Sequence, residues 1–303
     1  MQIFQGPTQR PSSPSAVAIG SFDGVHLGHR QLLRALKERA AARGLPALVY
    51  TFDPPARVLM QGVPFLSTLS EKLAHLEREG IDEAICVPFT REFSLRSEAD
   101  FLNDLRALQP QSIVVGSDFR FGYQRSGGPE DLREVCSDLC LLPILTVEGT
   151  EVRSSAIRER LQAGDLAGAA LLLGYDYAAS GVVVHGDGRG RQLGYPTANV
   201  RVPPGKLLPP GVFAAELHAE GQVLAAMVNV GTRPTVSAGG VPQLEAHALD
   251  FAGDLYGKEV QVVFRIRLRG EERFGSLEAL RLQLDRDAER SREALQTLGV
   301  IKP

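Results

Sequence analysis

Two histidines spaced as His-x-Gly-His, His26 and His29, lie where an apolar run gives way to a helical pattern, in the segment GSFDGVHLGH at residues 20–29. The start of a helix has unpaired backbone N–H groups and a positive partial charge, and both attract phosphate oxygens. Gly24 and Gly28 let a phosphate approach the main chain, and the imidazoles can donate hydrogen bonds as charge grows in a transition state. The segment therefore predicts a nucleotide phosphate site, although so short a motif alone more often marks a turn with two surface histidines.

A second candidate site lies in SGVVVHGDGRGRQLGYPTANV, residues 180–200. Glycines and arginines alternate in its loop, at Gly186, Gly188, Arg189, Gly190 and Arg191. Thr197 and Asn199 follow the loop and project to the same side if the chain is extended. A hydroxyl and an amide oxygen are hard ligands, suited to a magnesium ion that keeps several waters and bridges ATP phosphates. A hairpin turn with glycines explains much of the same pattern.

The loop SDFRFGYQRSGG, residues 117–128, follows an apolar strand predicted at residues 112–116. In an open parallel sheet, ligands bind beyond the carboxyl ends of the strands, where this loop and the His-x-Gly-His loop would both lie. Phe119 and Phe121 offer ring faces for a flat heterocycle, and the neighbouring arginines offer positive charge. A flexible surface loop with incidental aromatic residues explains the loop equally well.

The segment VRSSAIRERLQAGD, residues 152–165, combines hydroxyls and a guanidinium near a predicted helix start. Ser154 and Ser155, with the backbone N–H groups there and Arg158 one turn further on, suit the β- and γ-phosphates that leave as pyrophosphate. An N-capped surface helix is the commoner origin of such a segment.

Strands alternate with helices in the first half of the sequence. We expect strands at residues 16–19, 47–52, 84–87, 112–116 and 141–147, and helices at residues 30–43, 70–79, 97–108 and 166–173. Strand, crossover helix and strand imply a parallel pair. After a linker at residues 174–179 the pattern changes to strand after strand, which suits a small closed antiparallel barrel. The main strands of this half are expected at residues 212–217, 223–230, 245–249 and 260–268, with a final helix from about Ser276.

Length and composition limit the class of protein. At 303 residues the chain is long enough for two domains, given about 100–200 residues per domain. The net charge of -3 and the pI near 6.1 give no overall attraction to nucleic acid or anionic lipid. We find no secretory signal and no apolar run approaching the roughly 20 residues that cross a bilayer. The three cysteines form no CxxC pair, which favours a reduced, cytoplasmic setting. Cys136 and Cys140 are expected to pack on one helix.

Several segments together resemble one enzyme family. GSFDGVHLGHRQLL is similar to the signature of the bacterial bifunctional riboflavin kinase/FMN adenylyltransferases, also called FAD synthetases, and SDFRFG, VRSSAIR, GRGRQLGYPTAN, MVNVGTRPT and LEAHALDF are similar to further parts of that family. The resemblance covers nearly the whole chain. It implies a Rossmann-like parallel α/β adenylyltransferase domain at residues 1–176. For residues 177–303 it implies a riboflavin kinase domain, a small antiparallel β-barrel with a terminal helix.

The resemblance also implies two reactions. Riboflavin and ATP give FMN and ADP in the barrel, and FMN and ATP give FAD and pyrophosphate in the N-terminal domain, with Mg²⁺ as the metal. The catalytic residues that it implies are His26, His29 and Glu245, and Glu245 is the carboxylate base that takes the proton from the ribityl 5′-hydroxyl. Thr197 and Asn199 would hold the metal with ATP.

The family pattern further implies a set of nucleotide- and flavin-binding residues: Gly20, Phe22, Asp23, Gly24, Gly28, Asp118, Phe119, Phe121, Ser154, Ser155, Arg158, Gly186, Gly188, Arg189, Gly190 and Arg191. Two positions depart from the pattern. Arg153 stands where the family has a serine, and Pro55-Ala56 follows TFDP where the family has a histidine-proline or similar pair. Riboflavin, FMN, FAD and ATP are the expected partners, without nucleic acid or membrane.

Two other functions fit parts of the sequence. One is a different His-x-Gly-His adenylyltransferase, acting on a nicotinamide or pantetheine phosphate, with an unrelated barrel appended. The other is a flavin-responsive binding protein that kept the fold and lost turnover. A panel of substrates with ATP separates the first alternative, and binding without product would favour the second.

Overall fold

The protein is described by a computed structural model that covers residues 1–186, 190, 193–232 and 242–300. The backbone divides into two compact units, Met1–Ser154 and Ser155–Pro303. The domain boundary predicted between residues 176 and 177 stays a prediction. Within the described residues, no helix has the length and apolar character needed to pass through a bilayer.

The first unit is built on a parallel sheet of six strands in the order β1-β4-β3-β2-β5-β6. The strands are β1 Gln2–Phe4, β2 Ser15–Ile19, β3 Ala47–Asp53, β4 Glu83–Pro88, β5 Pro110–Gly116 and β6 Leu139–Leu142. After β4 the chain returns to the other side of β2 to form β5. The loops that follow β2 and β5 therefore leave the same edge of the sheet side by side, which is where such sheets bind ligands.

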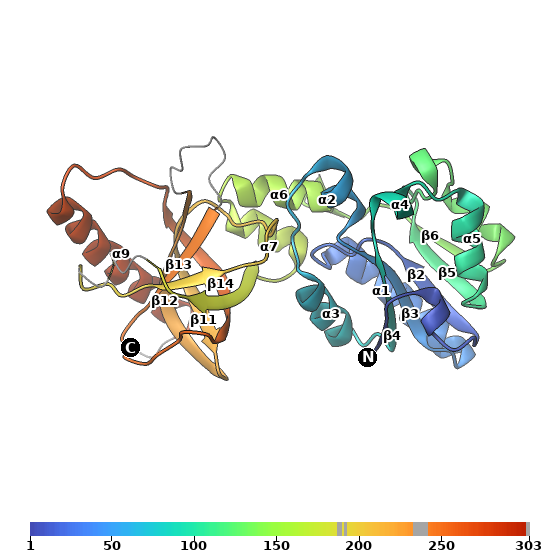
Figure 1. Ribbon diagram of the computed structural model, residues 1–303, viewed down its shortest axis with the longest axis horizontal. Helices are drawn as coiled ribbons and strands as arrows, with labels where there is room; N and C mark the ends of the chain where they lie inside the picture. The colour runs from blue at the N-terminus through green and yellow to red at the C-terminus, as the bar shows by residue number, and fades with distance from the viewer. Residues whose placement is uncertain (187–189, 191–192, 233–241, 301–303) are drawn as a thin grey trace. The chain divides into compact units, whose positions relative to one another are not determined.

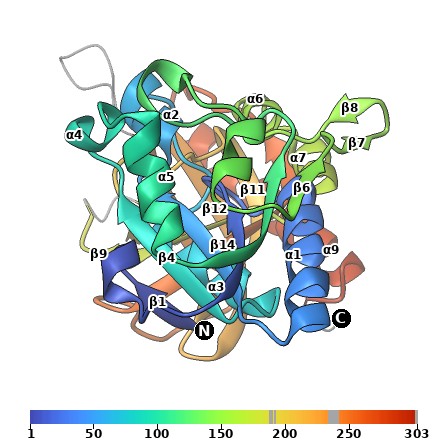
Figure 2. The same cartoon turned by 90° about the vertical axis from the view of Figure 1, so that its right-hand side faces the viewer.

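Helices cover both faces of this sheet, and Figure 2 shows α1 and α5 on opposite sides of it. The helices are α1 Leu27–Arg43, α2 Ala56–Gln61, α3 Leu69–Arg78, α4 Arg91–Ser94 and α5 Glu98–Arg106. Successive residues of a strand point to opposite faces. Accordingly, Ala16 and Ala18 of β2 pack with Leu33 of α1, whereas Val17 packs with Phe101 of α5. Both predicted α/β layers are thus present.

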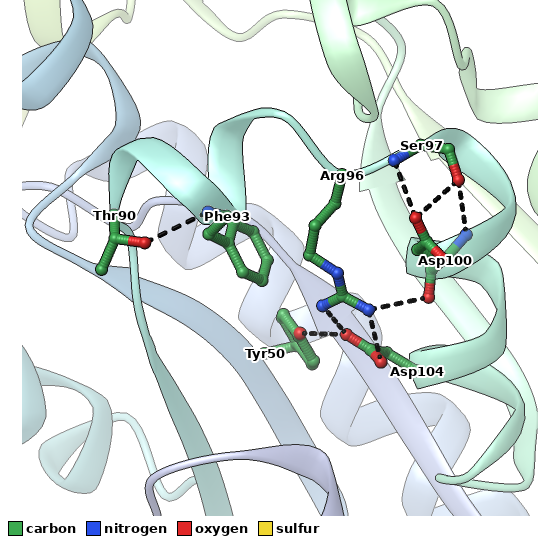
Figure 3. Close-up of polar contacts among 7 residues, drawn as sticks. All are labelled: Tyr50, Thr90, Phe93, Arg96, Ser97, Asp100 and Asp104. Carbon is green, nitrogen blue, oxygen red and sulfur yellow. Dashed lines mark hydrogen bonds and ion pairs between the residues drawn. The ribbon is translucent and has the colours of Figure 1, made fainter.

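Asp104, near the end of α5, connects Arg96 before the helix with Tyr50 of the sheet. The guanidinium of Arg96 makes two hydrogen bonds to Asp104, of 2.6 and 3.0 Å, and lies 5.2 Å from the ring centroid of Phe93 (Figure 3). The hydroxyl of Tyr50 in β3 lies 3.5 Å from the same carboxylate. Burial and the charge of Asp104 raise the pKa of Tyr50. A capping box of Ser97 with Asp100 begins the helix, as the sequence predicts.

Two predictions near the end of this unit are wrong. Cys136 and Cys140 do not share a helix, because a short 3-10 helix ends at Glu134 and Cys140 lies in β6. The strand expected over residues 141–147 is divided, since β6 ends at Leu142 and Pro143 has no N–H group to continue the ladder. Its remainder forms a separate antiparallel pair of β7 Thr146–Val147 with β8 Thr150–Glu151.

The second unit contains the predicted closed barrel, with strand order β10-β13-β12-β11-β14-β9. Its elements are α6 Ser154–Gln162, which begins at the last residue of the first unit, α7 Leu166–Leu173, β9 Ala178–Val184, β10 Ala198–Arg201, β11 Gly211–Ala219, β12 Gln222–Thr232, β13 Pro242–Ala248, β14 Glu259–Arg269 and α9 Leu277–Thr297. The strand β9 begins inside the predicted linker.

The terminal helix α9 lies against the outside of the barrel, beside β11 and β12 (Figure 1). Val212 and Ala214 of β11 pack with Ala288 and Leu295 of α9. Phe213 points to the other side of the strand, into the barrel, where its ring contacts that of Phe264. Successive side chains of β11 therefore point alternately into the barrel and toward α9. One set fills the barrel interior, and the other packs against the helix.

Candidate functional sites

His26 and His29 form one unit at the start of α1. His26 is the N-cap, and its Nδ1 accepts a hydrogen bond of 3.3 Å from the backbone N–H of His29. The two rings are stacked, with centroids 3.6 Å apart and planes 14° apart. Because Nδ1 of His26 is an acceptor, neutral His26 holds its proton on Nε2 and presents a donor on the opposite side of the ring. The helix start and two imidazoles therefore coincide, as predicted.

Burial disfavours the charged form of His29. Desolvation, followed by the charges of His26 and Lys72, lowers the pKa of His29 well below its ordinary value. The Nδ1 atom of His29 is buried and makes no hydrogen bond within the described structure. A buried polar atom of this kind is costly unless a ligand or water satisfies it.

The loop between β2 and α1 adopts a conformation that few side chains tolerate. Phe22, Gly24 and Val25 have positive φ values of 46°, 80° and 34°. The carboxylate of Asp23 compensates by accepting the backbone N–H groups of Leu66 and Ser67 at 2.8 and 3.1 Å. Asp23 is buried, so the structure assigns it to holding the loop, and its predicted contact with a nucleotide stays a prediction.

Two predicted aromatic contacts differ from expectation. Phe22 is fully buried, and its ring lies 5.0 Å from that of His29. Phe121 is also buried, in the core beside Phe101, with ring centroids 5.0 Å apart. Protein atoms cover both rings, so Phe22 anchors the loop after β2 and Phe121 anchors the loop after β5 in the protein interior. Phe119 is partly exposed and stays the candidate for contact with a flat heterocycle.

The loop after β5 is joined to the segment before α6 by an ion pair. Asp118 accepts a hydrogen bond of 2.7 Å from Arg153, whose Nε also donates to Glu151 at 2.7 Å. The hydroxyl of Ser154 donates to the backbone oxygen of Asp23 at 3.1 Å. Three of the predicted segments, around residues 23, 118 and 154, therefore meet at the carboxyl edge of the sheet.

Other predicted residues lie where the backbone is crowded. A Cβ atom on Gly28 would be 3.3 Å from the ring of His26 and 3.4 Å from the oxygen of Val152. One on Gly20 would be 3.2 Å from the ring of Phe22. Ser155 and Arg158 lie in the first turns of α6, and Arg158 is 7% exposed. Their predicted phosphate contacts stay predictions.

The second site lies on the outer face of the barrel. Asn199 of β10 and Asn229 of β12 are both paired with Glu245 of β13, one on each side. His247 shares this face, because it is paired with Met227, which packs in the cluster under α9. A carboxylate between two amides on three adjacent strands forms a polar group beside the apolar cluster under α9. Sequence reasoning missed Asn229, although the flanking valines of MVNVGTRPT mark it as a polar residue in a strand.

The side chains of Thr197 and Asn199 both face the glycine-rich segment. A Cβ atom on Gly186 would lie 2.1 Å from the Asn199 amide nitrogen and 2.7 Å from its oxygen, and one on Gly190 would lie 3.3 Å from the Thr197 hydroxyl. The glycines are thus needed where these two side chains approach the backbone. Gly188, Arg189 and Arg191 lie outside the described residues.

The segment before Thr197 is held from two sides. The backbone oxygen of Pro196 lies 2.8 Å from Nδ1 of His247, and the ring of Tyr195 contacts the same imidazole edge-on at 5.1 Å. The Tyr195 hydroxyl donates to Asp285 of α9. Burial and this bond raise the pKa of Tyr195 to about 12. His247 is therefore a support for the segment.

Metal ligation at this site would depend on Thr197 and Asn199. Among the described residues, no group of three His, Cys, Asp or Glu side chains converges as a metal site. A hydroxyl and an amide oxygen that face one glycine-rich segment fit a hard cation that takes its other ligands from water and phosphate.

Two known protein families match separate halves of the chain. The FAD synthetase family matches residues 8–156, and the riboflavin kinase family matches residues 173–295. The fold and the two matches define a two-domain enzyme of flavin nucleotide synthesis. The chain belongs to the bifunctional riboflavin kinase/FMN adenylyltransferase family.

Curated members of this family are similar over nearly the full length. The Escherichia coli K12 protein is 41% identical, covering 98% of this chain and 96% of the relative, and the Pseudomonas fluorescens protein is 38% identical, covering 96% and 97%. A crystal structure described as a macrolide-efflux protein from Streptococcus pneumoniae matches with a TM-score of 0.85 and 29% identity, covering 96% of this chain and 98% of that one. The similarity therefore covers both units of the chain.

Proposed function

We propose that this chain converts riboflavin to FMN with ATP in its barrel and FMN to FAD with ATP at the edge of its parallel sheet. The observation that supports the second reaction best is the stacked His26 and His29 pair at the N-terminus of α1. The family membership supports both activities. It weighs against an unrelated appended barrel and against a binding protein without turnover.

In the adenylyl transfer, an oxygen of the FMN phosphate attacks the α-phosphorus of ATP, and the bond to the bridging oxygen of pyrophosphate breaks. No covalent enzyme intermediate forms. The N-terminus of α1 and the donor on Nε2 of His26 stabilise the charge that develops on the α-phosphate. Burial lowers the pKa of His29, and its ring is proposed to donate a further hydrogen bond to the phosphate. Ser154, Ser155 and Arg158 are proposed to bind the pyrophosphate end.

In the phosphoryl transfer, the ribityl 5′-hydroxyl oxygen of riboflavin attacks the γ-phosphorus of ATP, and ADP leaves. Glu245 accepts the proton of this hydroxyl. Asn199 and Asn229 flank this residue on the neighbouring strands, and we propose that their amides orient its carboxylate. Mg²⁺, held by Thr197 and Asn199 together with ATP, would neutralise phosphate charge in this reaction. Gly186, Gly190 and the adjoining loop are proposed to contact the nucleotide.

A reconstitution assay tests the function directly. Purified protein is incubated with riboflavin, ATP and Mg²⁺, and separately with FMN, ATP and Mg²⁺, and the flavins are separated by chromatography. We expect FMN and FAD in the first mixture and FAD with pyrophosphate in the second. Flavin binding without either product would contradict the proposal, and so would turnover only with a nicotinamide or pantetheine phosphate.

A cytoplasmic location is part of this proposal. Both reactions consume ATP, and the resemblance of the chain is to bacterial enzymes. Fractionation of cells that express the tagged protein tests the location, and recovery of the protein outside the cytoplasmic fraction would contradict it.

A further inference from the structure

We propose that Lys72 is a positioning residue for adenylyl transfer, which fastens the His-x-Gly-His loop to β3 and holds a positive charge beneath that loop. This inference rests on the proposed function of the loop. Lys72 is fully buried in α3. Its ammonium group therefore acts through other residues and does not contact a ligand.

Hydrogen bonds connect this ammonium group to the loop in two steps. Nζ of Lys72 donates to the backbone oxygen of Phe52 at 2.7 Å and to the hydroxyl of Thr51 at 3.4 Å. The Thr51 hydroxyl in turn donates to the backbone oxygen of Ser21 at 3.2 Å. Ser21 is the second residue after β2, so the lysine secures the point at which the loop leaves the sheet.

The residues just before α3 also bind the loop, at Asp23 and Gly24. Leu66 and Ser67, just before α3, donate backbone N–H groups to Asp23, and the Ser67 hydroxyl accepts the N–H of Gly24 at 2.9 Å. Residues 66–72 therefore hold the loop just before its strained stretch and within it. An error of about 1 Å in such an arrangement is enough to slow catalysis by about 100-fold.

The charge of Lys72 is expensive to bury, which argues against a role in packing alone. Burial lowers the pKa of Lys72, and the negative charges of Asp23 and Asp53 oppose this effect. An apolar side chain would fill the same space without the desolvation cost. A cation below a phosphate-binding turn has a function that an apolar residue lacks, because it attracts the anionic ligand.

The same cation acts on the catalytic pair. The charges that lower the pKa of His29 come from His26 in its own loop and from Lys72 in α3, in addition to burial. Removing the charge of Lys72 should therefore make His29 easier to protonate. This effect is separate from any loss of stability, so it distinguishes positioning from packing.

The test compares Lys72→Met and Lys72→Arg in the full chain. For Lys72→Met we expect kcat for FAD formation from FMN to fall about 100-fold, with little change in the rate of FMN formation from riboflavin. Lys72→Arg keeps the charge and should recover part of the loss. The titration of the His29 ring, followed by NMR and assigned with His29→Gln, should move to higher pH in Lys72→Met and less in Lys72→Arg. Lys37→Met, which removes an exposed lysine of α1, is the control and should change neither quantity.

A folded Lys72→Met protein with wild-type kcat and an unmoved His29 titration would overturn the inference. If this variant does not fold, Thr51→Val decides, because it cuts the link to Ser21 without changing charge. We expect it to lower kcat for FAD formation, and an unchanged kcat would overturn the positioning role. Failure of the proposed function would instead appear in the unmutated protein, as no FAD or as no effect of His29→Ala.

Discussion

The imidazole of His26 caps α1 and at the same time stacks on the imidazole of His29, with ring centroids 3.6 Å apart. Helix formation and the arrangement of the two rings are therefore coupled. The hydrogen bond from the His29 N–H to Nδ1 of His26 fixes the tautomer of neutral His26.

The stability of the first unit should fall with pH on the acid side because of His29. Its pKa in the folded state is lowered, so below about pH 6.5 the unfolded chain binds a proton that the folded chain does not. Unfolding free energy measured in urea from pH 8 to 5 should decrease more steeply for the unmutated protein than for His29→Gln. The difference in slope is at most about 1.4 kcal/mol per pH unit. Equal slopes would contradict the assignment.

The two reactions should respond separately to a change at His29. His29→Ala removes a donor at the proposed adenylyl transfer site and should lower FAD formation by at least about 100-fold. FMN formation should stay near normal, because the barrel is untouched. Chromatography of both flavins from one reaction mixture measures the two rates together. Loss of both activities in a folded variant would argue against separate sites.

Changes in the barrel should have the opposite effect. Asn199→Ala removes a proposed metal ligand, and Glu245→Gln keeps the shape of the side chain but removes the base. Each should reduce FMN formation by about 100-fold or more, while FAD formation from supplied FMN continues. Raising the Mg²⁺ concentration should restore part of the activity of Asn199→Ala and none of that of Glu245→Gln. The reverse order of rescue would contradict these roles.

Gly186 should be intolerant of a methyl group for steric reasons. A Cβ atom there would lie 2.1 Å from the amide of Asn199, so Gly186→Ala must displace that side chain. We expect FMN formation to fall about tenfold or more, since one misplaced ligand is enough, with FAD formation from FMN unchanged. Gly275→Ala is the matched control, because a Cβ atom at Gly275 meets nothing within 4 Å. Equal rates for the two variants would show that the position of Asn199 is unimportant.

The ion pair of Asp118 with Arg153 should matter more for activity than for stability. The side chains of Arg153 and Asp118 are 35% and 54% exposed, so separating them should cost at most about 1 kcal/mol of unfolding free energy. Asp118→Ala should raise KM for FMN in FAD formation about tenfold, because the proposed hydrogen bond between the Asp118 carboxylate and the bound ligand is lost. The riboflavin KM of the kinase reaction should not change. If Arg153 acts only by holding Asp118, adding Arg153→Ser to Asp118→Ala should have no further effect.

Local sequence rules were sufficient for most of the elements and for the motifs. Ser97 and Asp100 predict a capping box because the bonds involved span three residues. The alternation of strands and helices predicts the parallel sheet, and the change to consecutive strands predicts the barrel. Local rules were insufficient at Cys136 and Cys140. Their four-residue spacing is compatible with a helix, but Cys140 became a strand residue because β6 pairs with β5.

The sequence by itself determined which residues could do chemistry, because His26, His29, Thr197 and Asn199 are each defined by neighbours a few positions away. The tertiary structure decided which of them meet and what supports them. Pairing of β13 with both β10 and β12 places Glu245 between Asn199 and Asn229, and burial turns Phe22 and Phe121 toward the core. These outcomes depend on packing between segments far apart in the chain. A short sequence pattern contains no information about such contacts.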